Sequence, residues 1–167
     1  MVNPNKKILS LVLTVLLLVK VNVLLARAGG GCFGADTKIS TVSGLSNIQD
    51  LKPGDVVLSR HHGHLQPAKV ITTYKVEPDN FLKLEIGNKT LFVTDEHLFA
   101  YKKGMYKRAK NLSKGDQVII YENNQWHKKY ISNISKISTT KPAYNLLVDA
   151  GSTYLANNVL VHNKGCF

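Results

Sequence analysis

Residues that can cut a polypeptide's own backbone lie at both ends of a long segment of this 167-residue chain. The thiol of Cys32 lies one residue after the carbonyl of Gly31. A five-membered ring closure would convert the amide between them into a thioester. The side-chain amide of Asn163 can attack its own backbone carbonyl, close a succinimide and release whatever follows. The sequence therefore predicts two self-cleavage sites, one at each edge of a single domain.

Both cuts need help with proton transfer, and histidines stand where they can give it. An amide resists a thiol unless its departing nitrogen is protonated, and imidazole is the side chain that titrates closest to neutral pH. His162 directly precedes Asn163 and can hydrogen-bond the developing charge on the carbonyl oxygen or protonate the leaving amine. The glycines at 29–31 suit the strained backbone that such a site requires.

The N-terminus has the pattern of an export signal. Lys6 and Lys7 provide a positive start, residues 8–19 form an apolar run, and Ala26-Arg27-Ala28 is an Ala-x-Ala cleavage motif. We expect a signal peptide at 1–28, cleaved after Ala28, followed by a glycine linker at 29–31, and hence a secreted or extracytoplasmic protein. If the signal is not cleaved, residues 8–25 would anchor the chain in a membrane until self-cleavage.

Composition excludes some functions and leaves others open. A hydrophobic fraction of 44% fits one globular domain, and a net charge of +11 raises the question of nucleic-acid binding. The densest basic segment, 102–110, has neither a recognition helix nor a zinc motif beside it, so we expect a solvated basic face and no specific nucleic-acid partner. The histidines at 61, 62 and 64 favour a polar hairpin tip over a metal site. No phosphate-binding loop is present, and we expect no cofactor.

The chain after residue 33 alternates short β-rich segments with turn residues, which predicts an all-β fold. A gap-free internal repeat aligns 50–58 with 111–119, and each copy is followed by strands that end in a histidine, His97 or His162. Two such units related by an approximate two-fold would bring these histidines together at the centre. The expected strands are 56–58, 69–76, 81–86, 90–93, 117–121, 130–137, 144–148 and 153–161, with a turn at Asn157-Asn158.

Three motifs in this order resemble those of the Hint domain, the module shared by inteins, bacterial intein-like proteins and the autoprocessing part of hedgehog proteins. They are residues 32–39 (CFGADTKI), 94–97 (TDEH) and 159–163 (VLVHN). The resemblance covers 32–163, leaving a tail at 164–167, and implies a horseshoe of two pseudo-two-fold related β subdomains preceded by a signal helix. It also implies that His97 protonates the departing nitrogen while Thr94 hydrogen-bonds the scissile peptide. The implied catalytic residues are Cys32, Thr94, His97, His162 and Asn163.

The sequence departs from the splicing pattern near its C-terminal end. Lys164 stands where a splicing intein has Cys, Ser or Thr, and Asn145 and Ser152 stand where the family usually has an acid and a histidine. Losing those helpers should slow asparagine cyclisation by about 100- to 10,000-fold. The resemblance therefore implies single-turnover autocleavage, closest to bacterial intein-like domains and biased towards Gly31-Cys32, with a thioester resolved by an external thiol, amine or water and with no partner required.

Other interpretations remain open at this point. Cys32 and Cys166 share the flank Gly-Cys-Phe and could form a disulfide that blocks the nucleophile until it is reduced. A non-catalytic secreted β-domain, stapled by that disulfide and binding an acidic partner, is the main alternative function. Transfer of the thioester to a sterol, as in hedgehog proteins, is disfavoured because no sterol-recognition segment follows the domain.

Overall fold

The computed structural model describes residues 30–163. The signal peptide expected at 1–28, the tail at 164–167 and the Cys32–Cys166 disulfide fall wholly or partly outside these residues, so they stay predictions. Within 30–163, no helix has the length and apolar character needed to cross a membrane. The only helical elements in this part of the chain are two single-turn 3₁₀ helices, η1 (Ile48–Asp50) and η2 (Ala109–Asn111).

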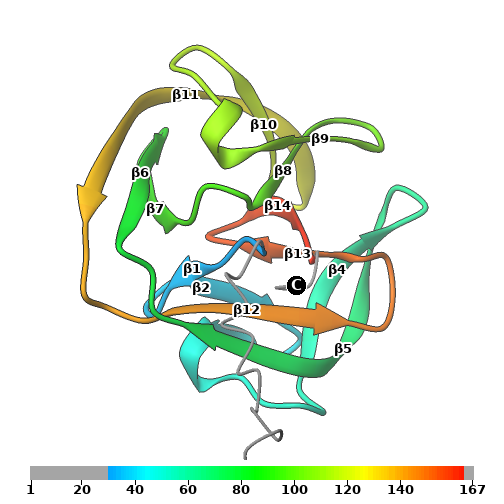
Figure 1. Ribbon diagram of the computed structural model, residues 1–167. Coiled ribbons are helices and arrows are strands. Elements are labelled where there is room, and N and C mark those ends of the chain that lie inside the picture. Colours follow the sequence, from blue (N-terminus) through cyan, green and yellow to red (C-terminus); the bar gives the residue numbers. More distant parts are fainter. Residues whose placement is uncertain (1–29, 164–167) are drawn as a thin grey trace, which may run out of the picture.

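The described chain is otherwise built from strands and turns, which confirms the all-β prediction (Figure 1). The first seven strands are β1 (Phe33–Gly34), β2 (Lys38–Thr41), β3 (Gly44–Asn47), β4 (Val56–His61), β5 (His64–Val76), β6 (Asn80–Ile86) and β7 (Lys89–Val93). The other seven are β8 (Leu98–Lys102), β9 (Met105–Arg108), β10 (Gln117–Glu122), β11 (Gln125–Ser138), β12 (Ala143–Val148), β13 (Thr153–Ala156) and β14 (Val159–His162).

The predicted repeat is a structural repeat. In the first copy η1 leads into the β4–β5 hairpin, and in the second η2 leads into the β10–β11 hairpin. The amide of Gly54 donates to the carbonyl of Val70 at 2.8 Å, and Gly115 donates to Ile131 at the same distance. Both glycines have positive φ, 100° and 91°, which a side chain would oppose. Two turns that match in sequence, backbone conformation and hydrogen bonding are two copies of one unit.

The two copies are joined by an exchange of strands. The long strands β5 and β11, of 13 and 14 residues, each begin in their own hairpin and then continue into a second pairing. There β5 pairs with β12 and β11 pairs with β6, both antiparallel. Figure 1 shows β5 and β12 side by side and β11 curving past β6. Each half therefore completes the sheet of the other, as the pseudo-two-fold prediction requires.

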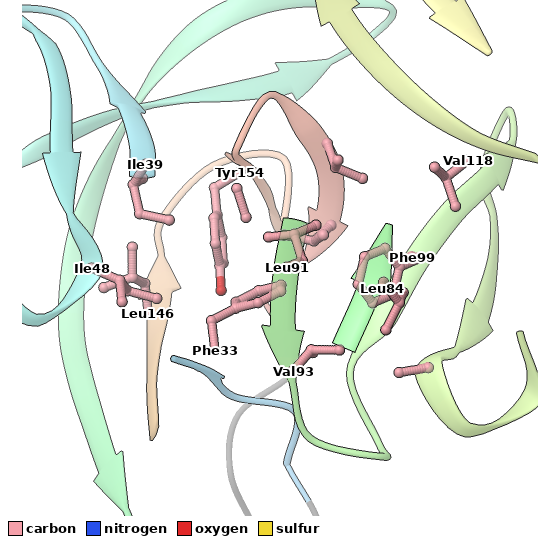
Figure 2. Packing of buried hydrophobic residues seen from close by; sticks show 14 of the residues in the cluster. Phe33, Ile39, Ile48, Leu84, Leu91, Val93, Phe99, Val118, Leu146 and Tyr154 are labelled. Carbon is pink, nitrogen blue, oxygen red and sulfur yellow. The ribbon is translucent and has the colours of Figure 1, made fainter. Parts of the chain in front are cut away.

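One main hydrophobic core lies between the two halves. Phe33, Phe99 and Tyr154 are fully buried within it, and the ring of Phe33 lies 6.2 Å from that of Phe99 and 6.4 Å from that of Tyr154 (Figure 2). Aromatic rings packed edge to face in this way add to the free energy gained by burying their area. Because Phe33 follows Cys32 directly, this packing fixes the position of the nucleophile.

The structure changes some strand boundaries and adds strands that the sequence pattern did not predict. The segment 153–161 is a hairpin rather than one strand, and the predicted turn at Asn157 and Asn158 is confirmed by their left-handed φ of 47° and 66° between β13 and β14. Strand β4 extends to His61, and the histidine segment forms the tip of the β4–β5 hairpin, with His62 and Gly63 at φ of 49° and 89°. The strands β1, β2, β3, β8 and β9 were not predicted.

Candidate active site

Strand β1 inserts between β7 and β12 and thereby positions Cys32. Phe33 pairs with Val93 on one side and with Tyr144 on the other. The residue before Phe33 must then lie beside the residue after Val93. Strand pairing, rather than the side chains themselves, brings Cys32 next to Thr94.

Cys32 and Thr94 are linked by two hydrogen bonds. The Cys32 amide donates to the Thr94 hydroxyl oxygen at 2.8 Å, and the Thr94 amide donates to the Cys32 carbonyl at 2.9 Å. The first of these bonds is made by the nitrogen that would depart from Gly31. The Cys32 side chain is fully buried and packs against Phe81 and Ala143. The scissile peptide is therefore held by a specific side-chain contact and shielded from bulk water.

His97 lies in the core beside this peptide. A turn closed by a hydrogen bond from its amide to the Thr94 carbonyl, at 3.3 Å, carries it inwards, and its own carbonyl accepts from the Ala109 amide at 2.7 Å. Its side chain is 1% exposed. The rings of Phe33, Phe99 and Tyr154 surround the imidazole at centroid distances of 4.1, 5.9 and 6.3 Å.

This aromatic enclosure makes His97 a neutral imidazole at physiological pH. Burial disfavours the charged form and lowers the pKa of His97 from 6.5 to about 3, the nearby backbone of Gly31 opposes the shift in part, and the charge of His162 adds to it. The Gly31 backbone is the polar group beside the imidazole, so the ring lies at the residue that carries the scissile carbonyl. His97 therefore starts without a proton for the departing nitrogen, and any proton that it delivers must first come from another group.

Gly31 fits against His97 so closely that no other residue could occupy its position unchanged. A Cβ built on Gly31 would overlap the Cα and Cβ of His97. Both Gly30 and Gly31 are buried. The glycine before the nucleophile thus allows the scissile carbonyl to approach the imidazole, a reason more specific than the strained backbone expected from sequence.

The C-terminal pair lies at the end of β14. Strand β14 pairs with β8 through Val161 and Phe99. Because β8 begins directly after His97, His162 at the end of β14 lies on the strand next to it. A positive charge on His162 lowers the pKa of His97, so the two imidazoles lie close enough to interact, as the repeat predicts. The ring of Tyr106 meets that of His162 edge-on, at 4.9 Å and 81°.

Asn163 is 3% exposed and is held from two directions. Its backbone amide donates to the Ser152 carbonyl at 2.9 Å, and its side-chain Nδ2 donates to the Val148 carbonyl at 3.1 Å. The Ser152 backbone therefore lies where the resemblance placed a helping histidine. Of the five predicted residues, Cys32, Thr94 and His97 form one connected group, His162 interacts electrostatically with His97, and Asn163 is anchored to Ser152 and Val148.

A buried polar pair, Asn145 and Tyr154, adds to the site. The Oδ1 of Asn145 accepts a hydrogen bond from the Tyr154 hydroxyl at 2.6 Å and from the Leu146 amide at 2.8 Å, and both Asn145 and Tyr154 are fully buried. The sequence pattern singled out Asn145 as a departure but missed Tyr154, which has the β-propensity of any strand residue. A buried side-chain amide needs hydrogen-bond partners, so Asn145 in an otherwise apolar strand is the signal that a polar side chain such as Tyr154 lies beside it.

The described residues contain no group of three or more His, Cys, Asp or Glu side chains able to hold a metal ion. The arrangement instead offers a thiol, a hydroxyl and a neutral imidazole at one peptide bond. That set can perform acyl transfer from nitrogen to sulfur.

Comparisons with known proteins agree with this geometry. A family model described as the pretoxin Hint domain matches residues 38–167. The solution structure of a bacterial intein-like domain from Clostridium thermocellum is 29% identical, with a TM-score of 0.71 over 79% of this chain and 98% of that one. The crystal structure of a DnaB intein from Synechocystis sp. PCC 6803 is 20% identical, with a TM-score of 0.72 over 80% of this chain and 99% of the intein.

At 20% identity, the similarity to the DnaB intein shows a shared fold and nothing more. A comparison with curated proteins finds no match. The family match covers most of the chain and includes four of the five candidate residues, beginning after Cys32. This chain belongs to the pretoxin Hint domain family, and its fold is that of a self-processing, intein-like domain.

Proposed function

We propose that the domain cleaves its own backbone at Gly31-Cys32 through a thioester. The observation that carries this proposal is the hydrogen bond from the Cys32 amide to Thr94, made beside a buried, neutral His97. An ordinary peptide nitrogen in a strand needs only a backbone acceptor. Here the acceptor is a side-chain hydroxyl, and the His97 imidazole lies against Gly31, on the other side of the scissile bond.

The reaction balances with these groups alone. Neutral His97 accepts the proton of the Cys32 thiol, and the thiolate attacks the carbonyl carbon of Gly31. As the carbon–nitrogen bond breaks, His97 returns the proton to the nitrogen of Cys32, which becomes a free amine. The products are a thioester between Gly31 and the Cys32 sulfur and an imidazole restored to its neutral form.

The low pKa of His97 supports the second half of this proton transfer, from the imidazole to the departing nitrogen. A weakly basic imidazole that is protonated only in passing is a strong proton donor at the moment when the nitrogen departs. Thr94 holds that nitrogen in place throughout, so the proton is delivered to a fixed atom.

An external nucleophile then resolves the thioester. Lys164 follows Asn163 in the sequence, and an amine there cannot relay the acyl group as a hydroxyl or thiol would. A thiol, an amine or water attacks the Gly31 carbonyl and releases the N-terminal segment with a modified or free carboxyl end. Cleavage at this edge is thereby uncoupled from the other edge.

Cleavage at Asn163 is the slower reaction. The attacking Nδ2 is engaged by the Val148 carbonyl, and Ser152 contributes a backbone carbonyl where a side-chain proton donor would speed the reaction. His162 is the group that protonates the leaving amine. Its contact with the Tyr106 ring holds the imidazole from one side.

Export places this chemistry outside the cytoplasm. The apolar run and Ala26-Arg27-Ala28 support a signal peptide removed after Ala28, and a signal that is retained would make Gly31-Cys32 the bond whose cleavage frees the domain from a membrane. Intact mass of the membrane and soluble fractions distinguishes the two cases.

A fusion with one reporter before Gly29 and another after Phe167 tests the assignment of the two cuts. Incubation with and without dithiothreitol, followed by electrophoresis, separates the two sets of fragments. Cys32→Ala should abolish thiol-dependent release of the first reporter and leave release of the second unchanged, whereas Asn163→Ala should do the reverse. Loss of both cuts in either variant would contradict two independent reactions.

A further inference from the structure

A basic trough lies between the β8–β9 and β10–β11 hairpins, away from the residues assigned above. It consists of two adjoining hollows of about 490 and 260 Å³ that share Lys102 and Lys128. The larger is also lined by Lys107 and the smaller by Arg60 and Lys103. The two hollows, here together called the trough, are thus lined by five cationic side chains.

Most of this charge is unneutralised by the protein. Lys107 forms an ion pair with Asp116 at 2.7 Å. Among residues 30–163, the other four cations have no carboxylate partner: Arg60, Lys102, Lys103 and Lys128. Lysines 102, 103 and 128 are exposed, so their repulsion is relieved only by solvent and salt. Like charges gathered without counter-charges indicate a surface shaped for an anionic ligand.

Arg60 is the fixed point of the trough. Its guanidinium lies over the ring of Trp126, 4.5 Å from the centroid, and this contact sets the plane of the group. Its Nε is buried and has no hydrogen-bond partner in the described part of the chain. A guanidinium held in one plane is suited to two parallel hydrogen bonds to a carboxylate.

The chemistry of the trough favours acidic protein over nucleic acid. Binding of single-stranded nucleic acid relies on exposed aromatic faces beside the cations, on which bases stack. Here Arg60 covers the Trp126 ring, and Tyr121 packs against that ring at 4.8 Å. Tyr101, which lines the larger hollow, likewise lies under Lys102 at 5.9 Å. Among the aromatic residues that line the trough, only Tyr130 leaves its ring to solvent, so the trough lacks a row of faces on which successive bases could stack.

We propose that the basic trough binds an acidic polypeptide segment, with Arg60 and Lys102, Lys103 and Lys128 pairing with its carboxylates. The trough uses residues from three hairpins that are distant in sequence, and it involves neither Cys32 nor Asn163. It is a second, non-catalytic activity of the same domain, and it holds whether or not the backbone is cleaved.

The test uses the full chain carrying Cys32→Ala and Asn163→Ala, which removes both proposed cleavages and keeps the protein intact. A fluorescein-labelled hexaglutamate peptide is titrated at low salt and its anisotropy measured. Lys103→Glu with Lys128→Glu removes two exposed cations from the trough, and the matched control is Lys136→Glu with Lys75→Glu, which makes the same charge change on exposed residues of β11 and β5. We expect the trough variant to weaken binding about tenfold or more and the control to weaken it about threefold or less.

A third variant, Trp126→Leu, removes the support of Arg60 while keeping every charge, and it should weaken binding as well. Equal weakening by the trough and control variants would overturn the proposal, because net charge alone would then explain binding. Absence of any binding by the parent chain would also overturn it. So would competition by an unlabelled thymidine oligonucleotide at the same trough with higher affinity than the peptide, because the partner would then be nucleic acid.

Discussion

Thr94 and Cys32 form a reciprocal pair of hydrogen bonds, in which the amide of each residue donates to an oxygen of the other. The Thr94 amide donates to the Cys32 carbonyl, whereas the Cys32 amide donates to the Thr94 hydroxyl. The acceptor for the scissile nitrogen is therefore the side chain of Thr94. Thr94→Val keeps the shape and removes that acceptor. We expect thiol-dependent cleavage to fall by about 100-fold and stability to fall by about 1–3 kcal/mol, because the amide is left unpaired.

Thr94→Ser is the matched control, because it keeps the hydroxyl. It should retain most of the cleavage rate, as measured by release of a reporter fused before Gly29. If valine and serine slowed the reaction equally, the methyl group and not the hydroxyl would be the functional part of Thr94.

Gly31→Ala tests the close approach of the scissile carbonyl to His97. A Cβ at this position would overlap the His97 backbone, so the peptide must move away from the imidazole and cleavage should fall by about tenfold or more. Gly34→Ala is the comparison, since its Cβ would lie 3.3 Å from the Cβ of Phe92, a tight contact that a small side-chain shift relieves. Equal cleavage rates for Gly31→Ala and the parent chain would show that the approach is not needed.

The buried His97 predicts a specific dependence of stability on pH. Its pKa is lowered from 6.5 to about 3, so between these values the unfolded chain binds more protons than the folded one. The free energy of unfolding should therefore be highest above pH 6.5 and fall as the pH drops towards 3, by up to about 1.4 kcal/mol per pH unit. Urea unfolding across this range measures it, and His97→Gln should flatten the slope.

A direct check on the same residue needs no variant. The imidazole carbon protons of His97 should keep neutral-form NMR shifts down to about pH 4. A His97 titration with a midpoint near pH 6.5 would contradict both the burial and the proposed proton flow.

Restoring the missing helpers should accelerate the C-terminal cut. Asn145→Asp places an acid where the Tyr154 hydroxyl and the Leu146 amide already donate, and Ser152→His places an imidazole at a residue whose carbonyl binds Asn163. The two changes together should raise cleavage after Asn163 by about 100-fold. Ser152→Ala is the control. Unchanged C-terminal cleavage in the double variant would show that Val148, which holds Nδ2, limits the reaction instead.

Much of this architecture can be predicted from the sequence because the repeat is marked by turn chemistry. The Gly-Asp pairs at 54–55 and 115–116 occupy equivalent turns, and the placement of His97 near His162 follows from the symmetry they signal. The strands β1, β2, β3, β8 and β9 escape prediction because each has only two to five residues, too few to show an alternating pattern. Local propensity carries little information about them.

Contacts between segments that are far apart in sequence explain what the motifs miss. The aromatic rings around His97 come from β1, β8 and β13, and nothing in the motif at 94–97 indicates that the histidine is enclosed by them. Likewise, Arg60 joins Lys102 and Lys128 only through the packing of three hairpins. Within the segment 102–110 alone, the lysines resemble an ordinary solvated face.

The thioester at Gly31 is the central claim, and the mass of the released N-terminal segment tests it most directly. A reporter fused before Gly29 is incubated with dithiothreitol and analysed by intact mass spectrometry, beside a Cys32→Ala control. We predict a reporter that ends at Gly31 and carries one dithiothreitol in thioester linkage, absent from the control. A reporter released at another bond, or released equally by Cys32→Ala, would contradict the proposed function.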